Sequence, residues 1–156
     1  MKAFYAGSFD PFTIGHLDIA LRALEMFDEL IIGIGVNKFK HNELSIEKRL
    51  RLIKKLFVEK PEVTVFAYDG LTAEVAKENG ADVLVRGVRN VIDFEKEKEL
   101  ADINLEVFNM QTVMIPSSPS LSYISSSMVR ELKHFGCDAS RFIAGEDKGK
   151  DREEKI

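Results

Sequence analysis

The stretch MKAFYAGSFDPFTIGH, residues 1–16, places a short apolar run before a loop that contains two glycines and ends at a histidine. The run Ala3–Ala6 predicts a buried β-strand, because consecutive apolar residues leave it no polar face. Gly7 permits backbone conformations closed to other residues, and Gly15 lets a ligand approach the start of the next helix closely. Unpaired N–H groups at a helix start carry partial positive charge and suit phosphate. The stretch therefore predicts a strand–loop–helix unit with an anion site at its turn.

The same alternation of strand and helix continues along the chain. Short apolar runs rich in β-branched residues predict four further strands, at Leu30–Val36, Val63–Tyr68, Val83–Val85 and Thr112–Ile115. Apolar residues between these runs recur at the spacing of a helix face. The chain is therefore predicted to form an α/β domain, a doubly wound five-stranded parallel sheet covered by helices on both faces.

Each predicted helix has an apolar stripe and a boundary signal of its own. The first two helices have the stripes Leu17, Leu21 and Leu24, and Ile46, Leu50, Ile53 and Phe57, the latter behind the N-cap Ser45. A short third helix is capped by Thr72 and ends at Gly80. The last two have the stripes Phe94, Ala101, Leu105 and Phe108, behind Asp93, and Met128, Leu132 and Phe135, which follow Ser125–Ser127 and end at Gly136.

Composition and charge set the class of protein. The 156 residues are 45% hydrophobic and 31% charged, which favours one globular domain over a disordered chain. A net charge of −4 provides no general field for nucleic acid or an anionic membrane, so neither is expected as a partner. The single cysteine, Cys137, excludes a disulfide framework, and we expect a buried thiol in a reducing cytoplasm.

Neither a membrane span nor a signal peptide is expected, because no apolar run approaches about 18 residues. We therefore expect a soluble cytoplasmic protein. The predicted domain covers residues 1–143, and the highly charged residues 144–156 are predicted to form a solvated, flexible tail.

Candidate site residues follow the predicted strands, because ligands of such sheets bind outside the carboxyl ends of the strands. His16 is expected in the first turn of the first helix, facing the mouth of the sheet. Arg86 and Arg89 follow the fourth strand, and their forked donors match phosphate oxygens. Ser125–Ser127 offer capping hydroxyls and a second anion cradle, while Lys40 could reach an anion as a flexible point charge.

Each of these segments could also have no function. The first loop could be only a turn, Arg86 and Arg89 surface arginines, Lys40 a solvated lysine, and Ser125–Ser127 part of an ordinary serine-rich loop. The first loop is not a dinucleotide fingerprint, because the third glycine is missing, and it lacks the Gly-Lys-Ser/Thr of a P-loop. A response-regulator receiver would need acidic residues where Gly7 and Ser8 stand. No Asp/His cluster suggests a permanently bound metal.

Four sequence blocks together resemble one family. They are Gly-Ser-Phe-Asp-Pro before Thr13-Ile-Gly-His16; Arg86-Gly-Val-Arg89; Asp93-Phe-Glu-Lys-Glu97; and Ile124-Ser-Ser-Ser127 before Met-Val-Arg130. Over roughly residues 2–143 the chain resembles the phosphopantetheine adenylyltransferases, bacterial nucleotidyltransferases with a His/Thr-x-Gly-His signature and a Rossmann-like fold. The order and spacing of all four blocks match that family.

The resemblance implies a reversible reaction in which ATP and 4′-phosphopantetheine give dephospho-coenzyme A and pyrophosphate, the penultimate step of coenzyme A synthesis. The phosphate of the acceptor would attack the α-phosphorus of ATP directly. It also implies a homohexamer and assistance by Mg²⁺, which would be held through the ATP phosphates and water rather than by protein ligands.

Residue roles are likewise implied by the resemblance. The catalytic group would be His16, Ser8, Lys40 and Arg86, with His16 donating to the α-phosphate; the family most often has Thr where Ser8 stands. ATP would be bound by Ser8, Phe9, His16, Gly87, Val88, Arg89, Glu97, Leu121, Ser122, Tyr123, Ile124, Ser125, Ser126 and Ser127. Phosphopantetheine would be bound by Ser8, Lys40, Thr72 and Arg86.

Three alternatives stay open. A nicotinamide mononucleotide adenylyltransferase or a cytidylyltransferase shares the first motif but usually differs in the arginine and final serine blocks. A nucleotide-binding module without catalysis would not need the full set Ser8, His16, Lys40, Arg86 and Arg89.

Overall fold

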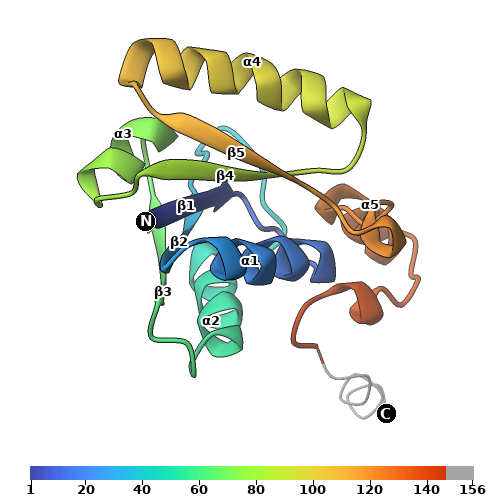
Figure 1. The fold of residues 1–156 in the computed structure, drawn as a ribbon. Helices are drawn as coiled ribbons and strands as arrows, with labels where there is room; N and C mark the ends of the chain where they lie inside the picture. The colour runs from blue at the N-terminus through green and yellow to red at the C-terminus, as the bar shows by residue number, and fades with distance from the viewer. Residues whose placement is uncertain (147–156) are drawn as a thin grey trace.

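The computed structural model describes residues 1–146, and within them the strands form one parallel sheet (Figure 1). The strands are β1 (Lys2–Gly7), β2 (Glu29–Gly35), β3 (Val63–Tyr68), β4 (Val83–Val88) and β5 (Gln111–Pro116). Every pairing between neighbours is parallel. The predicted five-stranded α/β architecture is confirmed for this part of the chain.

The order of the strands is β3-β2-β1-β4-β5, so the sheet grows in opposite directions from β1 and β4. This reversal opens a crevice between the connections that leave the two central strands at their carboxyl ends. The carboxyl ends of β1 and β4 and the segments after them carry the first motif and the two arginines. The topology therefore brings the sequence blocks to one edge of the sheet.

Helices cover both faces of the sheet. The elements are α1 (Ile14–Met26), α2 (Ile46–Leu56), α3 (Thr72–Glu78), α4 (Val91–Phe108) and α5 (Ser126–His134), with short 3-10 turns η1 (Pro119–Leu121) and η2 (Ser140–Phe142). Helices α1 and α2 lie on one face, and α3 and α4 lie on the other (Figure 1). Helix α5 packs with η2 in a small apolar cluster beside the carboxyl edge.

Side chains of β1 alternate between the two cores, as the pleat of a strand requires. Tyr5 belongs to the core under α1 and α2, and Phe4 belongs to the core under α3. Gly33 of β2 is needed for space, because a Cβ there would lie 2.4 Å from the Phe4 ring. The buried Phe4 ring therefore occupies the space that a side chain at position 33 of β2 would need.

Three predicted helix faces need correction. In α1 the buried residues are Ile19, Ala20 and Ala23, while Leu21 is 39% exposed. Small alanines let the helix approach the sheet closely, and Leu21 points away from it. In α4 no residue is buried, and Phe94 and Leu105 of the predicted stripe are exposed. Phe135 of the stripe predicted for α5 is 73% exposed and lies just beyond the helix.

Helix starts were predicted well where a hydroxyl caps the helix. Ser45 accepts a hydrogen bond from Lys48 N–H, and Ser125 accepts one from Met128 N–H, which confirms both N-caps. The predicted cap Thr72 is wrong: α3 begins after Leu71, without a side-chain cap. Helix α4 begins after Asn90, three residues before Asp93, because the Asn90 side chain accepts from Asp93 N–H.

The prediction of a buried thiol is wrong, since Cys137 is exposed. It follows α5 and Gly136 in a surface segment in which Phe135 is exposed as well. At the end of the described chain, Ala144 is buried in the main core, and its N–H donates to Phe12 O. The remainder of the predicted tail, residues 147–156, lies outside the described residues. Within residues 1–146, no helix combines the length and apolarity needed to cross a bilayer.

Candidate active site

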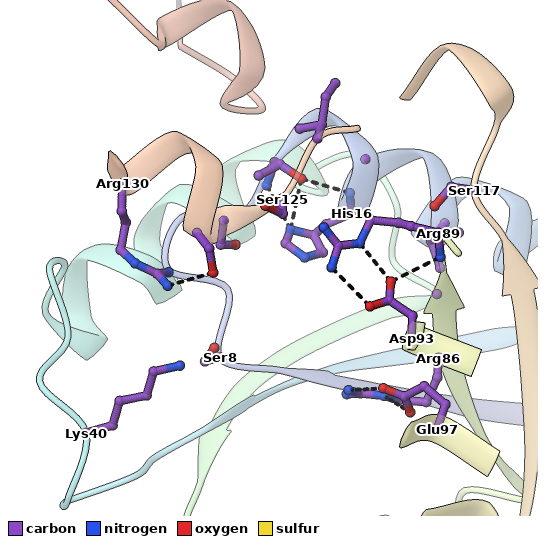
Figure 2. Close-up of a pocket in the computed structure, with 17 residues that line it drawn as sticks. Ser8, His16, Lys40, Arg86, Arg89, Asp93, Glu97, Ser117, Ser125 and Arg130 are labelled. Carbon is purple, nitrogen blue, oxygen red and sulfur yellow. Dashed lines mark hydrogen bonds and ion pairs between the residues drawn. The ribbon is translucent and has the colours of Figure 1, made fainter. Parts of the chain in front are cut away.

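Loops from both halves of the sheet enclose a cavity of about 240 Å³ at the carboxyl edge, here called the main cavity (Figure 2). Residues in and around four strand–helix connections line it: Ser8, Thr13, Gly15, His16 and Ile19; Lys40; Arg86, Gly87, Arg89, Asp93 and Glu97; and Ser117, Ile124, Ser125, Ser126, Ser127 and Arg130. The structure thus brings together the histidine, the two arginines, the lysine and the serine block that the sequence separates by more than 100 positions.

An aromatic cluster packs against His16 behind the main cavity. Phe9 lies edge-on to Tyr5, Phe12 and His16, with ring centroids 5.1–5.2 Å apart. Phe9 has φ of 48°, a left-handed conformation that usually costs about 1 kcal/mol or more and is held here by packing. Gly7 does not adopt such a conformation; it is required because a Cβ would lie 2.7 Å from the Phe9 ring. The expected reason for Gly7 is therefore corrected from backbone freedom to space.

His16 is fixed in one orientation by the start of α1. The Thr13 N–H donates to His16 Nδ1 at 2.9 Å, and the His16 N–H donates to Thr13 Oγ1 at 3.2 Å. This is a capping box with histidine in the third helical position. Because Nδ1 accepts a hydrogen bond from a backbone N–H, we assign the ring proton to Nε2. The imidazole is thus oriented as a donor to the cavity.

The same surroundings keep His16 neutral. Burial among Phe9 and Phe12, together with the positive charges of Arg89 and Arg86, lowers the pKa of His16 to about 3. Figure 2 shows the Arg89 guanidinium beside the imidazole ring. His16 at neutral pH is therefore a neutral hydrogen-bond donor, not an imidazolium.

Arg86 lies near the end of β4 and not after it, which corrects the expectation from the sequence, whereas Arg89 follows the strand directly; each is aligned by a carboxylate from α4. Arg86 donates to both oxygens of Glu97, at 2.8 and 2.7 Å, and also to Ala6 O. Arg89 donates to both oxygens of Asp93, at 2.9 and 3.2 Å. Burial lowers the pKa of Arg86, but the hydrogen bonds and charge of Glu97 outweigh it, so the pKa is raised and the cation persists. The first turns of α4 therefore orient two guanidinium groups at the cavity.

Two helix N-termini face the main cavity. Gly15, in the first turn of α1, lies against the segment before α5: a Cβ there would be 3.9 Å from Ile124 O. The first N–H groups of each helix have no partner within the helix and carry partial positive charge. The Ser126 hydroxyl donates to Pro11 O at 2.8 Å, which ties the start of α5 to the first loop. The arrangement forms a double cradle suited to a polyphosphate.

Lys40 approaches the cavity from the loop after β2. Its side chain points towards Ser8 (Figure 2), and among the described residues no ion pair is recorded for it. Ser8 is held from behind, because Arg49, only 2% exposed, donates to Ser8 O at 2.7 Å. A serine with a fixed backbone and an adjustable ammonium thus lie on the same side of the cavity.

A second cavity of about 400 Å³, here called the side cavity, adjoins the main one. Arg86 and Glu97 line both cavities, whereas Thr72 lines only the side cavity. The Thr72 hydroxyl shares a 2.7 Å hydrogen bond with Tyr68 OH. Most other lining groups are apolar: Leu71, Leu84, Leu100, Ala101, Ile103 and Phe108. The two cavities together form an extended site with arginine at their junction.

Some residues expected to bind ATP do not line the main cavity with their side chains: Phe9, Val88, Leu121, Ser122 and Tyr123. Tyr123 is 63% exposed and lies edge-on to Phe142. The Phe9 ring is buried, so contact with a ligand would be through its backbone. The roles assigned to these residues stay predictions.

Several residues that shape the site had no assigned role in the sequence analysis. Asp10, Thr13, Asp93 and Arg130 stand inside the quoted motifs, so their positions were a usable signal. Asp10 and Arg49 are buried polar side chains, each 2% exposed, that hold loop backbone. No spacing in the sequence pairs them with their acceptors and donors, which come from distant loops.

Comparison with known proteins agrees with the fold and shows the family. A family model described as cytidylyltransferase-like matches residues 4–132, which places the chain among the nucleotidyltransferases. It is 46% identical over 142 residues to the phosphopantetheine adenylyltransferase of Phocaeicola vulgatus, covering 91% of this chain and 94% of that protein. It is 47% identical over 141 residues to that of Porphyromonas gingivalis, covering 90% and 92%. The chain belongs to the phosphopantetheine adenylyltransferase family.

A solved structure shares the fold at much lower identity. The bifunctional NMN adenylyltransferase/ADP ribose pyrophosphatase from Francisella tularensis superposes with a TM-score of 0.69 at 14% identity. The match covers 94% of this chain but 45% of that protein, so this chain spans less than half of its length. The likeness confirms the architecture of the nucleotidyltransferase domain.

Proposed function

We propose that this protein transfers the adenylyl group of ATP to the phosphate of 4′-phosphopantetheine and releases pyrophosphate, in the reversible step that forms dephospho-coenzyme A. One observation carries the proposal: a cradle for a polyphosphate and a more apolar cavity meet at Arg86. ATP would occupy the main cavity and the acceptor arm the side cavity. The two reacting phosphates would then meet at the junction.

The chemistry needs alignment more than activation. A phosphate monoester has a second pKa of about 6, so the acceptor is already nucleophilic near pH 7 without a general base. Arg86 and Lys40 would hold that phosphate, and the N-termini of α1 and α5 would hold the ATP phosphates. Placing both groups for in-line displacement removes much of the entropic barrier.

His16 would stabilise the charge that moves onto the α-phosphate in the transition state. Its Nε2–H is a donor fixed by Thr13, and its lowered pKa keeps it from acting as an imidazolium acid. A preorganised donor in a desolvated site costs no reorganisation when the charge develops. Ser8 would steady the same group or the attacking phosphate from the opposite wall.

The side cavity suits an elongated acceptor with an apolar backbone and a few amides. Leu71, Leu100 and Ile103 would contact its methyl and methylene groups. Thr72 and Asn104 offer hydrogen-bonding groups on the same wall. These contacts support a pantetheine arm over a second nucleoside, which would require polar partners for its sugar hydroxyls.

Mg²⁺ is part of the proposal, bound through the phosphates of ATP. Within residues 1–146, no group of three or more His, Cys, Asp or Glu side chains is arranged to hold a metal ion. The two carboxylates at the cavity, Asp93 and Glu97, are each paired with an arginine. Mg²⁺ favours phosphate oxygens and water, and when bound it would neutralise charge on the phosphates.

We also propose a homo-oligomer that works in the cytoplasm, with a hexamer as the expected state. Exposed apolar side chains occur along the whole of helix α4, each 41% to 71% exposed: Val91, Ile92, Phe94, Leu100, Ile103, Leu105 and Val107. Such a surface is unusual on a monomer and is typical of a protein interface. Light scattering after gel filtration should give a mass of about six chains, and a monomer would contradict this part of the proposal.

A pyrophosphorolysis assay tests the reaction itself. Dephospho-coenzyme A, NAD⁺ and a CDP-alcohol are each offered with pyrophosphate and Mg²⁺, and formation of nucleoside triphosphate is measured. We expect ATP from dephospho-coenzyme A alone. Production of ATP only from NAD⁺, or of CTP from the CDP-alcohol, would contradict the proposed acceptor. Binding of ATP without turnover of any substrate would contradict catalysis.

A further inference from the structure

Asp10 is a buried carboxylate that binds backbone rather than a basic side chain. It is 2% exposed, and its two oxygens accept from Glu43 N–H and Leu44 N–H, each at 2.9 Å. Hydrogen bonds to an ionised acceptor are roughly twice as strong as neutral ones. Asp10 therefore joins the loop after β1 to the loop after β2 by a two-point clamp.

The clamp lies at the end of the loop that carries Lys40. Between Asn37 and Leu44, the hydrogen bonds recorded to other parts of the described chain are those to Asp10. The ion pair between Lys38 and Asp69 is exposed on both sides and contributes little. The position of this loop relative to the main cavity thus depends on Asp10.

The backbone of Asp10 also binds Arg130, a residue that lines the main cavity. Its carbonyl accepts from Arg130 Nη1 at 2.7 Å, and Arg130 Nη2 donates to Ser127 Oγ. Ser8 lies two residues before it, with its own carbonyl held by Arg49. One residue therefore sets the spacing between the Lys40 loop, the first loop and the start of α5.

We propose that Asp10 is a positioning residue, which acts through the Glu43–Leu44 backbone to place the Lys40 ammonium against Ser8 and the reacting phosphates. The inference rests on the proposed adenylyl transfer and assigns to Asp10 no contact with substrate. Its effect on turnover is transmitted through Lys40. Loss of the clamp therefore matters only while Lys40 is present.

Asp10→Asn keeps the shape of the side chain but breaks the clamp. An amide offers one acceptor oxygen and one NH₂ donor, so one of the two backbone N–H groups would face another donor. Misplacement of a catalytic group by about 1 Å can cost up to roughly 10²-fold in rate. We expect kcat to fall by about 10-fold, no more than when Lys40 itself is removed, with the KM for ATP little changed.

A double-mutant cycle with Lys40→Met separates positioning from general damage. Single-turnover rates are measured for the wild type, Asp10→Asn, Lys40→Met and the double variant. We expect Asp10→Asn to cost less than about 3-fold in the Lys40→Met background, far below its cost in the wild type. Equal costs in the two backgrounds would overturn the proposal.

Asp82→Asn is the matched control. Asp82 accepts from Lys2 N–H at 2.8 Å, so it also binds backbone between two segments, but at the amino ends of the strands. Its substitution should leave turnover unchanged in both backgrounds. A loss in Asp82→Asn equal to that in Asp10→Asn would indicate general destabilisation and would count against a positioning role.

Hydrogen exchange provides a readout independent of catalysis. The amides of Glu43 and Leu44 should exchange faster in Asp10→Asn than in the wild type, and unchanged protection would overturn the clamp. If Asp10→Asn does not fold, Glu43→Pro removes one donor from the loop side and takes its place in the cycle. A wild type without adenylyl transfer would contradict the proposed function instead, and faster exchange in Asp10→Asn would still support the clamp.

Discussion

The loop after β1 and the loop after β2 both supply groups to the main cavity, yet they are built in opposite ways. In the first, Phe9, Phe12 and Thr13 are buried, and His16 is held by a capping box. In the second, the residues before Leu44 make few bonds outside the loop, and Phe39 is fully exposed. The first loop presents a fixed donor, whereas the second presents a charge on a flexible stem.

The difference fits two separate demands on a group-transfer site. Stabilising a short-lived transition state favours donors that need no rearrangement, because reorganisation would add to the barrier. Admitting one substrate and releasing another favours a group that can move aside. The rigid loop would therefore serve the reacting phosphorus, and the looser loop the incoming and leaving phosphates.

The largest effect is expected when a group in the rigid loop after β1 is removed. His16→Ala should lower turnover by about 10²–10³-fold, because a donor used only in the transition state is removed. The affinity for ATP should change little, since the two helix N-termini remain. Steady-state kinetics and ATP binding by calorimetry give both quantities, and an equal loss in both would contradict the role of His16.

Arg86→Ala tests the junction between the two cavities. Each charge-assisted hydrogen bond to phosphate contributes about 1.5–3 kcal/mol, so the affinity for 4′-phosphopantetheine should fall by roughly 10- to 100-fold. Glu97 would also lose its partner, which adds to the loss. Arg51→Ala, an exposed arginine on α2, is the control. Unchanged acceptor binding in Arg86→Ala, measured by calorimetry, would contradict the assignment.

The pH dependence of stability reports on the desolvated environment of His16. A histidine with an unfolded pKa of about 6.5 and a folded pKa of about 3 takes up its proton only on unfolding between these values. Its contribution is therefore intact above pH 6.5 and is lost as the pH falls towards 3.

This effect can be isolated with His16→Gln. Between pH 7 and pH 5 the wild type should lose about 2 kcal/mol more unfolding free energy than the variant. Urea unfolding at the two pH values measures the difference. A parallel loss in both proteins would show that His16 titrates normally in the folded state.

The smallest expected effect concerns the looser loop. Lys40→Met should lower the catalytic rate by roughly 10-fold, less than His16→Ala, because a solvated flexible charge loses part of its interaction to water and entropy. Lys40→Arg should recover part of the rate, since the charge is retained. A larger loss in Lys40→Met than in His16→Ala would reverse the proposed division between the two loops.

Prediction from the sequence succeeded where the signal is local. The strand Val63–Tyr68 was predicted to the residue, and the caps Ser45 and Ser125 were correct, because burial patterns and capping hydroxyls act over a few neighbouring residues. The four motif blocks also met in one place, since parallel strands deliver the loops after them to one edge.

Prediction failed where a distant neighbour decides the outcome. Leu21 was assigned to the buried face of α1, but the sheet receives Ala20 and Ala23 there. Cys137 was expected to be buried because cysteine usually is, yet it is exposed in the surface segment after α5. Thr72 bonds to Tyr68 instead of capping α3.

The sequence by itself determined the alternation of strands and helices, the glycine and histidine of the first turn, and the family to which the motifs point. Only the tertiary structure decided that His16 is a neutral donor with its proton on Nε2, that Arg86 joins two cavities, and that Asp10 holds the Lys40 loop. The physical reason is the separation along the chain between the residues that interact. Periodicity and capping depend on residues a few positions apart, whereas desolvation, ion pairing and loop spacing depend on groups that only folding brings together.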